Sequence, residues 1–217
     1  MRFIYKTNLV LVLMCNVLFF ASCETAYYQT MEKMGVHKRD ILVSRVQDAR
    51  NAQQATKEQF KSTLEKFKAA IQFDGGNLEK KYEQLQDEFE DSQAKAKTVK
   101  SRIDDVERVA DALFEEWKKE LEQYSKKSLK QSSKRKLQET QRQYRKLIRA
   151  MRRAESKVDP VLAAFQDHVL FLKHNLNARA IASLDKELII VQSDVNTLIE
   201  EMEASIQEAD RFLKSIQ

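Results

Sequence analysis

Few residues of this chain have side chains suited to nucleophilic or metal chemistry. The 217 residues include two cysteines, Cys15 and Cys23, and three histidines, His37, His168 and His174. The last two histidines are six positions apart, about 240° around a helix, so they do not share a face. No glycine-rich phosphate loop is present either. We therefore expect no enzymatic activity, no metal site and no cofactor, and Cys23 is the residue with the clearest chemistry.

The N-terminal stretch has the features of an export signal. Arg2 and Lys6 precede a mainly apolar run from Leu9 to Ala21. This run is shorter than the roughly 20 residues that a membrane-spanning helix needs, and it fits the apolar region of a signal peptide. We predict that residues 1–22 are a signal peptide that takes no part in the fold.

The sequence at the end of this run resembles the lipobox of bacterial lipoproteins. In that pattern small residues, here Ala21 and Ser22, precede a cysteine whose sulfur receives a diacylglyceryl group. The resemblance implies cleavage after Ser22 and lipidation of Cys23, whose acyl chains would hold the protein at a membrane. Phe20 departs from the pattern, which usually has leucine there. The alternative is a plain secretory cleavage nearby, which leaves Cys23 free or oxidised.

The composition of the remaining chain favours long helices. Three glycines and one proline accompany 33% charged residues, whereas a compact α/β enzyme of this length needs more turn-forming residues. We predict that residues 23–37 form the lipid anchor and a tether, and that residues 38–217 form a helical bundle domain.

Apolar residues recur at alternating steps of three and four, the pattern of helices that pack against other helices. The pattern is most regular in residues 78–117, where its length is typical of coiled coils. In residues 38–72 the middle of the apolar stripe is polar, with Arg50, Gln53 and Lys57, and we expect weaker packing there.

Three breaks are predicted between the helical stretches, near Gly75–Gly76, Ser125–Ser133 and His174–Asn177. A restart is expected at Asp159 and Pro160, which suit an N-cap and a first helical residue. The sequence therefore predicts an all-α fold, an elongated antiparallel coiled-coil-like bundle of three to four long helices. The alternative is a very long two-helix hairpin with one helix continuous through Gly75–Gly76.

Net charge alternates along the chain. Residues 38–72 have eight basic and four acidic side chains (+4), and residues 77–124 have nine and fourteen (−5). Residues 126–158 have thirteen and two (+11), and residues 184–217 have three and eight (−5). Opposite charges favour the pairing of adjacent helices, although each exposed ion pair contributes only about 0–1 kcal/mol.

The basic stretch at residues 126–158 is the strongest surface feature. Its charge exceeds that of either acidic stretch, so we expect it to bind an anionic lipid, envelope polymer or protein. Neutralisation by its acidic neighbours is the alternative, and export excludes nucleic acid as a partner. The candidate anion-binding residues are Lys134, Arg135, Lys136, Arg142, Arg145, Lys146, Arg149, Arg152 and Arg153.

Three stretches, HKRDILVSRVQDAR, FDGGNLEKKY and VLFLKHNLNARAIASL, together resemble a family of uncharacterised, mostly proteobacterial lipoproteins that share a domain of unknown function. The resemblance covers nearly the whole mature chain. It implies a Gram-negative envelope setting, and the residue after Cys23, Glu24 in place of aspartate, favours the outer membrane facing the periplasm. We therefore expect a lipid-anchored envelope spacer, scaffold or interaction protein. The alternative is a protein that binds or shapes anionic membranes through its basic helix.

Overall fold

The computed structural model describes residues 37–71, 78–175 and 184–216, and this part of the chain is α-helical. Its helices are α2 (Lys38–Ile71), α3 (Leu78–Leu121), α4 (Lys127–Glu155), α5 (Val158–His174) and α7 (Asp185–Ile216). The chain divides into two units after Leu42. Of the first unit the structure describes residues 37–42, where the His37 carbonyl accepts the first backbone hydrogen bonds of α2. The packing described below is that of the second unit, Val43–Gln217.

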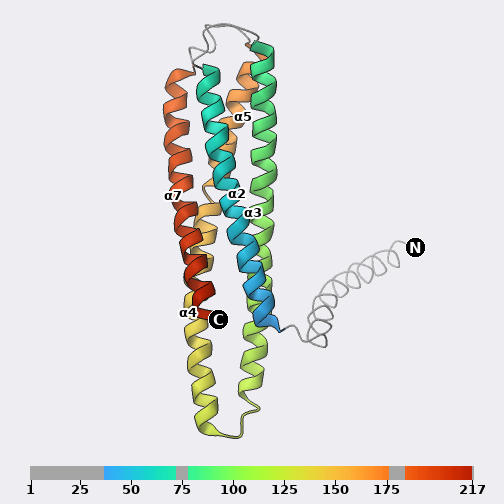
Figure 1. Cartoon of the computed structure of the whole chain (residues 1–217), viewed down its shortest axis with the longest axis vertical. Helices are drawn as coiled ribbons and strands as arrows, with labels where there is room; N and C mark the ends of the chain where they lie inside the picture. The colour runs from blue at the N-terminus through green and yellow to red at the C-terminus, as the bar shows by residue number, and fades with distance from the viewer. Residues whose placement is uncertain (1–36, 72–77, 176–183, 217) are drawn as a thin grey trace, which may run out of the picture. The chain divides into compact units, whose positions relative to one another are not determined.

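The second unit is a bundle of antiparallel helical columns (Figure 1). Helices α4 and α5 follow one another in a single column, and α2, α3 and α7 each form another. Each column runs opposite to the one before it in the chain. The predicted all-α antiparallel bundle of long helices is therefore confirmed. None of the described helices combines the length and the apolar character needed to cross a membrane.

The pairing of α2 with α3 rules out the continuous-helix alternative. The hydroxyl groups of Thr63 and Ser92 lie 2.9 Å apart. In one straight helix, residues separated by 29 positions would be about 43 Å apart. The chain therefore reverses direction between α2 and α3. The predicted turn at Gly75–Gly76 itself lies outside the described residues.

The break predicted at Ser125–Ser133 is shorter than expected. Helix α3 ends at Leu121 and α4 already begins at Lys127, so most of the predicted connection is helical (Figure 1). The segment lacks glycine and proline, and its lysine, leucine and glutamine residues are good helix formers. A hydrogen bond of 2.8 Å from the Trp117 indole to the Ser133 hydroxyl joins the two helices near this end.

The restart between α4 and α5 is confirmed, but its predicted capping is wrong. Helix α5 begins at Val158 and its N-cap is Lys157, which makes no side-chain capping bond. Asp159 therefore lies inside the first turn, where a carboxylate still favours the positive end of the helix dipole. Pro160 is tolerated there because the first helical N–H groups have no acceptor within the helix. At the other end, α5 stops at His174, close to the break predicted there.

Two aromatic groups dominate the core. In one, the ring of Phe165 stacks on Phe67 with a centroid separation of 4.8 Å and on Phe60 at 6.0 Å. In the other, Tyr144 meets Phe114 edge-on at 5.3 Å and Phe212 at 6.5 Å. Because each group draws rings from different helices, both hold the columns of the bundle together.

The polar middle of the α2 stripe becomes a buried polar layer between these aromatic groups. Gln53 is fully buried, and its Oε1 accepts a hydrogen bond of 2.8 Å from the equally buried Ser205 hydroxyl. Lys57 reaches Glu203 of α7 at 3.4 Å. Among the described residues, the Gln53 Nε2 atom has no hydrogen-bond partner. The apolar packing of α2 is therefore interrupted where the sequence predicted, and pairs of polar side chains lie at that level.

Candidate functional site

The basic helix α4 packs between the two acidic helices, as the alternating charge predicts. It contacts α3 and α7, and ion pairs cross both boundaries. Arg152 binds Asp104 of α3 at 2.6 Å and also contacts Glu107. Arg153 binds Glu201 of α7 at 2.6 Å. The acidic neighbours therefore neutralise part of the basic surface.

Arg152 is the most strongly held of these cations. It also bonds to Glu155 of its own helix at 2.7 Å, and its side chain is 33% exposed. The hydrogen bonds with Glu107, Glu155 and Asp104 raise the pKa of Arg152 above its ordinary value, although partial burial opposes the rise. This side chain links α4 to α3 and is not available to a ligand.

Other predicted anion-binding residues differ in their surroundings. Arg142 pairs with Glu139 on the same helix, and the Lys136 ammonium donates to the Ser215 carbonyl at 3.3 Å. Besides Lys136, five predicted residues form no ion pair with a carboxylate in the described part of the chain. These exposed residues are Lys134, Arg135, Arg145, Lys146 and Arg149. Neutralisation of α4 is therefore incomplete.

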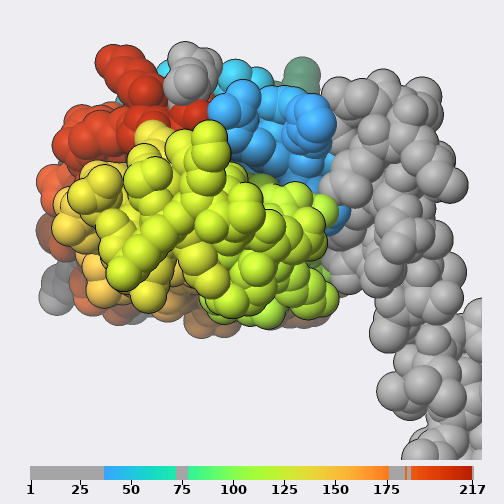
Figure 2. Space-filling model, turned by 90° about the horizontal axis from the view of Figure 1, so that it is seen from below, coloured from blue at the N-terminus to red at the C-terminus, as the bar shows by residue number. Residues whose placement is uncertain are grey.

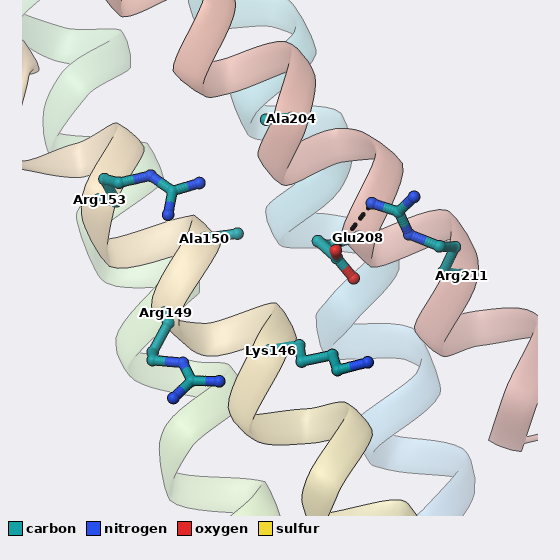
Figure 3. A pocket seen from close by; sticks show the side chains of 7 residues that line it. All are labelled: Lys146, Arg149, Ala150, Arg153, Ala204, Glu208 and Arg211. Carbon is teal, nitrogen blue, oxygen red and sulfur yellow. Dashed lines mark hydrogen bonds and ion pairs between the residues drawn. The ribbon is translucent and has the colours of Figure 1, made fainter.

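A groove of about 210 Å³ lies on the surface where α4 meets α7. Figure 3 shows Lys146 and Arg153 reaching from α4 toward α7, and Arg211 paired with Glu208 on the α7 side. We call this site the basic groove. Its lining residues are Lys146, Arg149, Ala150 and Arg153 of α4 and Ala204, Glu208 and Arg211 of α7.

Small side chains make room for the groove. Ala150 is buried against the bundle, and Ala204 faces the same space from α7. A larger side chain at either position would fill part of the space between the surrounding arginines. Because the alanines end at Cβ, the long cationic side chains stand around a hollow.

The basic groove carries a net positive charge. Its lining has four cations and one carboxylate, a formal charge of +3. Arg211 is held by Glu208 at 2.7 Å, and Arg153 by Glu201. Lys146 and Arg149 are the groove cations that pair with no carboxylate of the described residues. A bound phosphate or carboxylate would accept charge-assisted hydrogen bonds from them. Since a water molecule occupies about 30 Å³ in the liquid, the groove has room for a group larger than a single small ion.

The sequence predicted part of this site. Of the nine candidate residues, Lys146, Arg149 and Arg153 line the groove, whereas Arg152 faces α3 and the others lie elsewhere on α4. Arg211 was missed because it lies in an acidic stretch, and only the pairing of α4 with α7 brings it to the site. The sequence signal that could have indicated the groove was the pair of small residues Ala150 and Ala204, on the two helices that line it. Cys23, with the predicted cleavage site at Ala21 and Ser22, lies outside the described residues.

The histidines do not converge on a site. His168 is buried against the Phe67 ring, and its Nδ1 lies 2.6 Å from the Ala164 carbonyl oxygen. His174 is exposed at the end of α5. Across the described ranges, no group of three or more histidine, cysteine, aspartate or glutamate side chains is arranged to hold a metal ion.

A second hollow, of about 390 Å³, lies between α5 and α7. Phe171, Ile190 and Val191 are among its lining residues, and Asp167 and Glu187 are its carboxylates. This hollow does not gather positive charge, so the basic groove is the better candidate for binding an anion.

Comparison with known proteins identifies the family. Residues 27–216 match the family described as "Protein of unknown function (DUF2959)". Because the match extends over most of the chain, the protein belongs to this family, and the expected resemblance to a family of unknown function is confirmed. No curated protein matches the chain.

Proposed function

We propose that this member of the DUF2959 family is a lipid-anchored interaction protein of the bacterial cell envelope that binds an anionic group through the basic groove. The helical bundle serves as a scaffold that presents the groove. In this proposal the protein binds a partner and catalyses no reaction. The anionic group is a phosphate or carboxylate carried by an envelope polymer or by a lipid headgroup.

The excess of cations in the basic groove is the observation that carries the proposal. Surface lysines and arginines of helical bundles are commonly matched by nearby carboxylates at small net gain. Here no carboxylate within the described ranges pairs with Lys146 or Arg149, which lie beside two further arginines, although α4 lies between two acidic helices. Like charges held close together repel one another, so an anion that enters the groove relieves that repulsion as well as forming new bonds.

The cellular location in this proposal rests on the N-terminal sequence. The apolar run, followed by Ala21, Ser22 and Cys23, supports export and acylation, and the resemblance to proteobacterial lipoproteins supports a Gram-negative envelope. Several acyl chains on one residue give stable membrane attachment, whereas one chain gives only reversible binding. We place the bundle in the periplasm, anchored to the outer membrane.

Two cysteine variants test the anchor. Cells that express the full chain are fed a clickable fatty acid, and its incorporation into the protein is measured together with membrane fractionation. Cys23→Ser should abolish labelling, whereas the matched variant Cys15→Ser should keep it because Cys15 is removed with the signal peptide. Continued labelling and membrane retention of Cys23→Ser would disprove the anchor.

Equal charge changes inside and outside the groove test ligand binding. The purified lipidated protein in neutral detergent is titrated with lipopolysaccharide, with phosphatidylglycerol or with inorganic phosphate, and the three arms distinguish polymer, lipid and free anion. Replacing Lys146 and Arg149 with glutamine should weaken binding at least about tenfold, because hydrogen bonds between charged groups contribute about 1.5–3 kcal/mol each. The control replaces Lys95 and Lys97, two exposed residues of α3, with glutamine. Equal losses in both variants would show a diffuse charge effect and refute a specific groove.

A further inference from the structure

The end of the bundle at which α3 connects to α4 extends past the end of α7. The Lys136 ammonium donates to the Ser215 carbonyl near the last residues of α7. Helix α4 begins nine positions earlier, at Lys127, so it continues about 14 Å beyond that contact. Figure 2 shows the yellow-green end of α3 and start of α4 standing in front of α7. We call residues 122–135 the hairpin tip.

The hairpin tip combines positive charge with exposed apolar side chains. It contains five basic residues and one acidic residue, Glu122, for a formal charge of +4. Glu122 pairs with Lys130 at 2.8 Å, whereas Lys126 and Lys127 have no ion pair within the described structure. Tyr124 is 41% exposed and Leu129 is 52% exposed. Lysines beside an aromatic and an aliphatic side chain are typical of surfaces that lie at a lipid–water interface.

The chain enters the bundle at the same end. Arg50 of α2 pairs with Asp210 of α7 at 3.1 Å, and the two helices are antiparallel. Val43 lies seven positions before Arg50, at the level where α7 ends. The predicted lipid anchor, Cys23, precedes the first residue of α2, Lys38, by 15 residues, a length of chain that spans at most about 50 Å. The tether is thus attached at the end of the bundle that carries the hairpin tip, and its maximum reach exceeds the 14 Å of α4 that projects there.

We propose that the hairpin tip binds the headgroup layer of the anionic bilayer that holds the acyl chains of Cys23. Tyr124 and Leu129 enter the interface, and Lys126 and Lys127 contact lipid phosphates. This contact fixes the orientation of the bundle, with α5 and the start of α7 far from the membrane. The inference rests on the lipid anchor of the proposed function, but not on ligand binding in the basic groove.

Depth-dependent quenching tests the contact in the lipidated protein. Leu129→Cys is labelled with a thiol-reactive fluorophore after reconstitution into vesicles of phosphatidylethanolamine and phosphatidylglycerol that contain nitroxide lipids. The control is Ile189→Cys, which is 71% exposed near the beginning of α7, at the other end of the bundle. The nitroxide lipids should quench the label at position 129 and leave the label at position 189 unaffected.

A charge reversal then tests the role of the lysines. The double variant Lys126→Glu and Lys127→Glu, in the Leu129→Cys protein, should lower the population of the quenched state by about tenfold. The equal charge change Lys95→Glu and Lys97→Glu, at two exposed positions along α3, should leave quenching unchanged. Quenching in pure phosphatidylcholine vesicles as strong as in anionic vesicles would overturn the proposed recognition of anionic lipid.

The outcomes separate this inference from the proposed function. Loss of membrane retention because Cys23 carries no acyl chain would refute the anchor, and the inference would fall with it. Retention through the acyl chains with an unquenched label at position 129 would refute the tip contact and leave the anchor standing.

Discussion

The buried pair of Gln53 and Ser205 offers the sharpest test of how the bundle is stabilised. The Ser205 hydroxyl donates to Gln53 Oε1 at 2.8 Å, and both side chains are fully buried. The Gln53 Nε2 atom has no partner among the described residues. A buried donor without a partner costs about 1–3 kcal/mol of folding free energy. The pair therefore contains both a favourable hydrogen bond and an unfavourable unpaired group.

Three variants separate these two contributions. Ser205→Ala alone removes the hydrogen bond and leaves both polar atoms of the Gln53 amide unpaired, so it should destabilise the fold by about 1–3 kcal/mol. Gln53→Leu removes the unpaired donor with little change of volume, and the Ser205 hydroxyl can then turn to the carbonyl four residues earlier in its helix. The double variant removes every polar atom of the pair. It should be more stable than the natural sequence by about 1–2 kcal/mol, because the lost hydrogen bond contributes only about 1 kcal/mol net.

Denaturant unfolding of the lipidated protein in mild detergent measures these differences. Far-ultraviolet circular dichroism follows the helices, and Trp117, the single tryptophan, reports on the packing of α3 against α4. The effects of the two substitutions on the free energy of unfolding should be strongly non-additive. Ser205→Ala should destabilise the natural protein but not the protein that already carries Gln53→Leu. A double variant less stable than the natural sequence would refute the reasoning, since it would mean that Nε2 is hydrogen-bonded in solution, for example to an internal water.

Three further changes probe the core and the ion pairs, each measured by denaturant unfolding. Phe165→Ala should cost about 3–5 kcal/mol because it empties the centre of an aromatic stack, whereas Ile190→Ala, on the surface, should change stability by less than about 0.5 kcal/mol. Arg152→Lys should lower the free energy of unfolding by about 1 kcal/mol, because lysine cannot reproduce the forked contacts with α3, and the loss should be smaller at high salt. The control Arg145→Lys should leave stability unchanged. Equal effects of the two variants would refute a special role for Arg152. Burial, together with the nearby carboxylates, raises the pKa of Tyr144 above its ordinary value of 10. The unfolded chain therefore loses the phenolic proton at a lower pH than the folded chain, so the stability of the fold falls as the pH rises above about 10. Tyr144→Phe should reduce this fall, and an unchanged pH profile would contradict the assignment.

Helix type, helix length and charge partners were predictable from local patterns. Alternating steps of three and four residues require a helix with an apolar stripe, and long stripes such as that of residues 78–117 require partner helices. The alternation of net charge predicted which helices pack side by side, because the basic stretch can lie beside two acidic stretches at little electrostatic cost. Contacts such as Arg152–Asp104 and Arg153–Glu201 follow that pattern.

Helix ends and the continuity of the chain were less predictable. The stretch from Lys127 to Ser133 has the polar composition of a loop, but nothing in it opposes helix formation, and the contact between Trp117 and Ser133 supports the helix. The start of α5 differs from the predicted cap because the backbone hardly leaves the helical conformation at Ser156 and Lys157. Contacts between α2 and α3, such as that of Thr63 with Ser92 and that of Gln59 with Glu88, excluded one helix running through the glycine pair.

By itself the sequence determined that the chain forms long helices, that one of them is strongly basic, and that Cys23 follows an apolar run in a lipobox-like context. These properties depend on residue type and short spacings along the chain. The tertiary structure decided which cations are available to bind a ligand. It directs Arg152 toward α3, where this side chain pairs with Asp104, and it brings Arg211 of an acidic helix beside Lys146 and Arg149. The reason is geometric, since an ion pair forms only between side chains that the packing brings within about 4 Å, and packing joins residues far apart in the sequence.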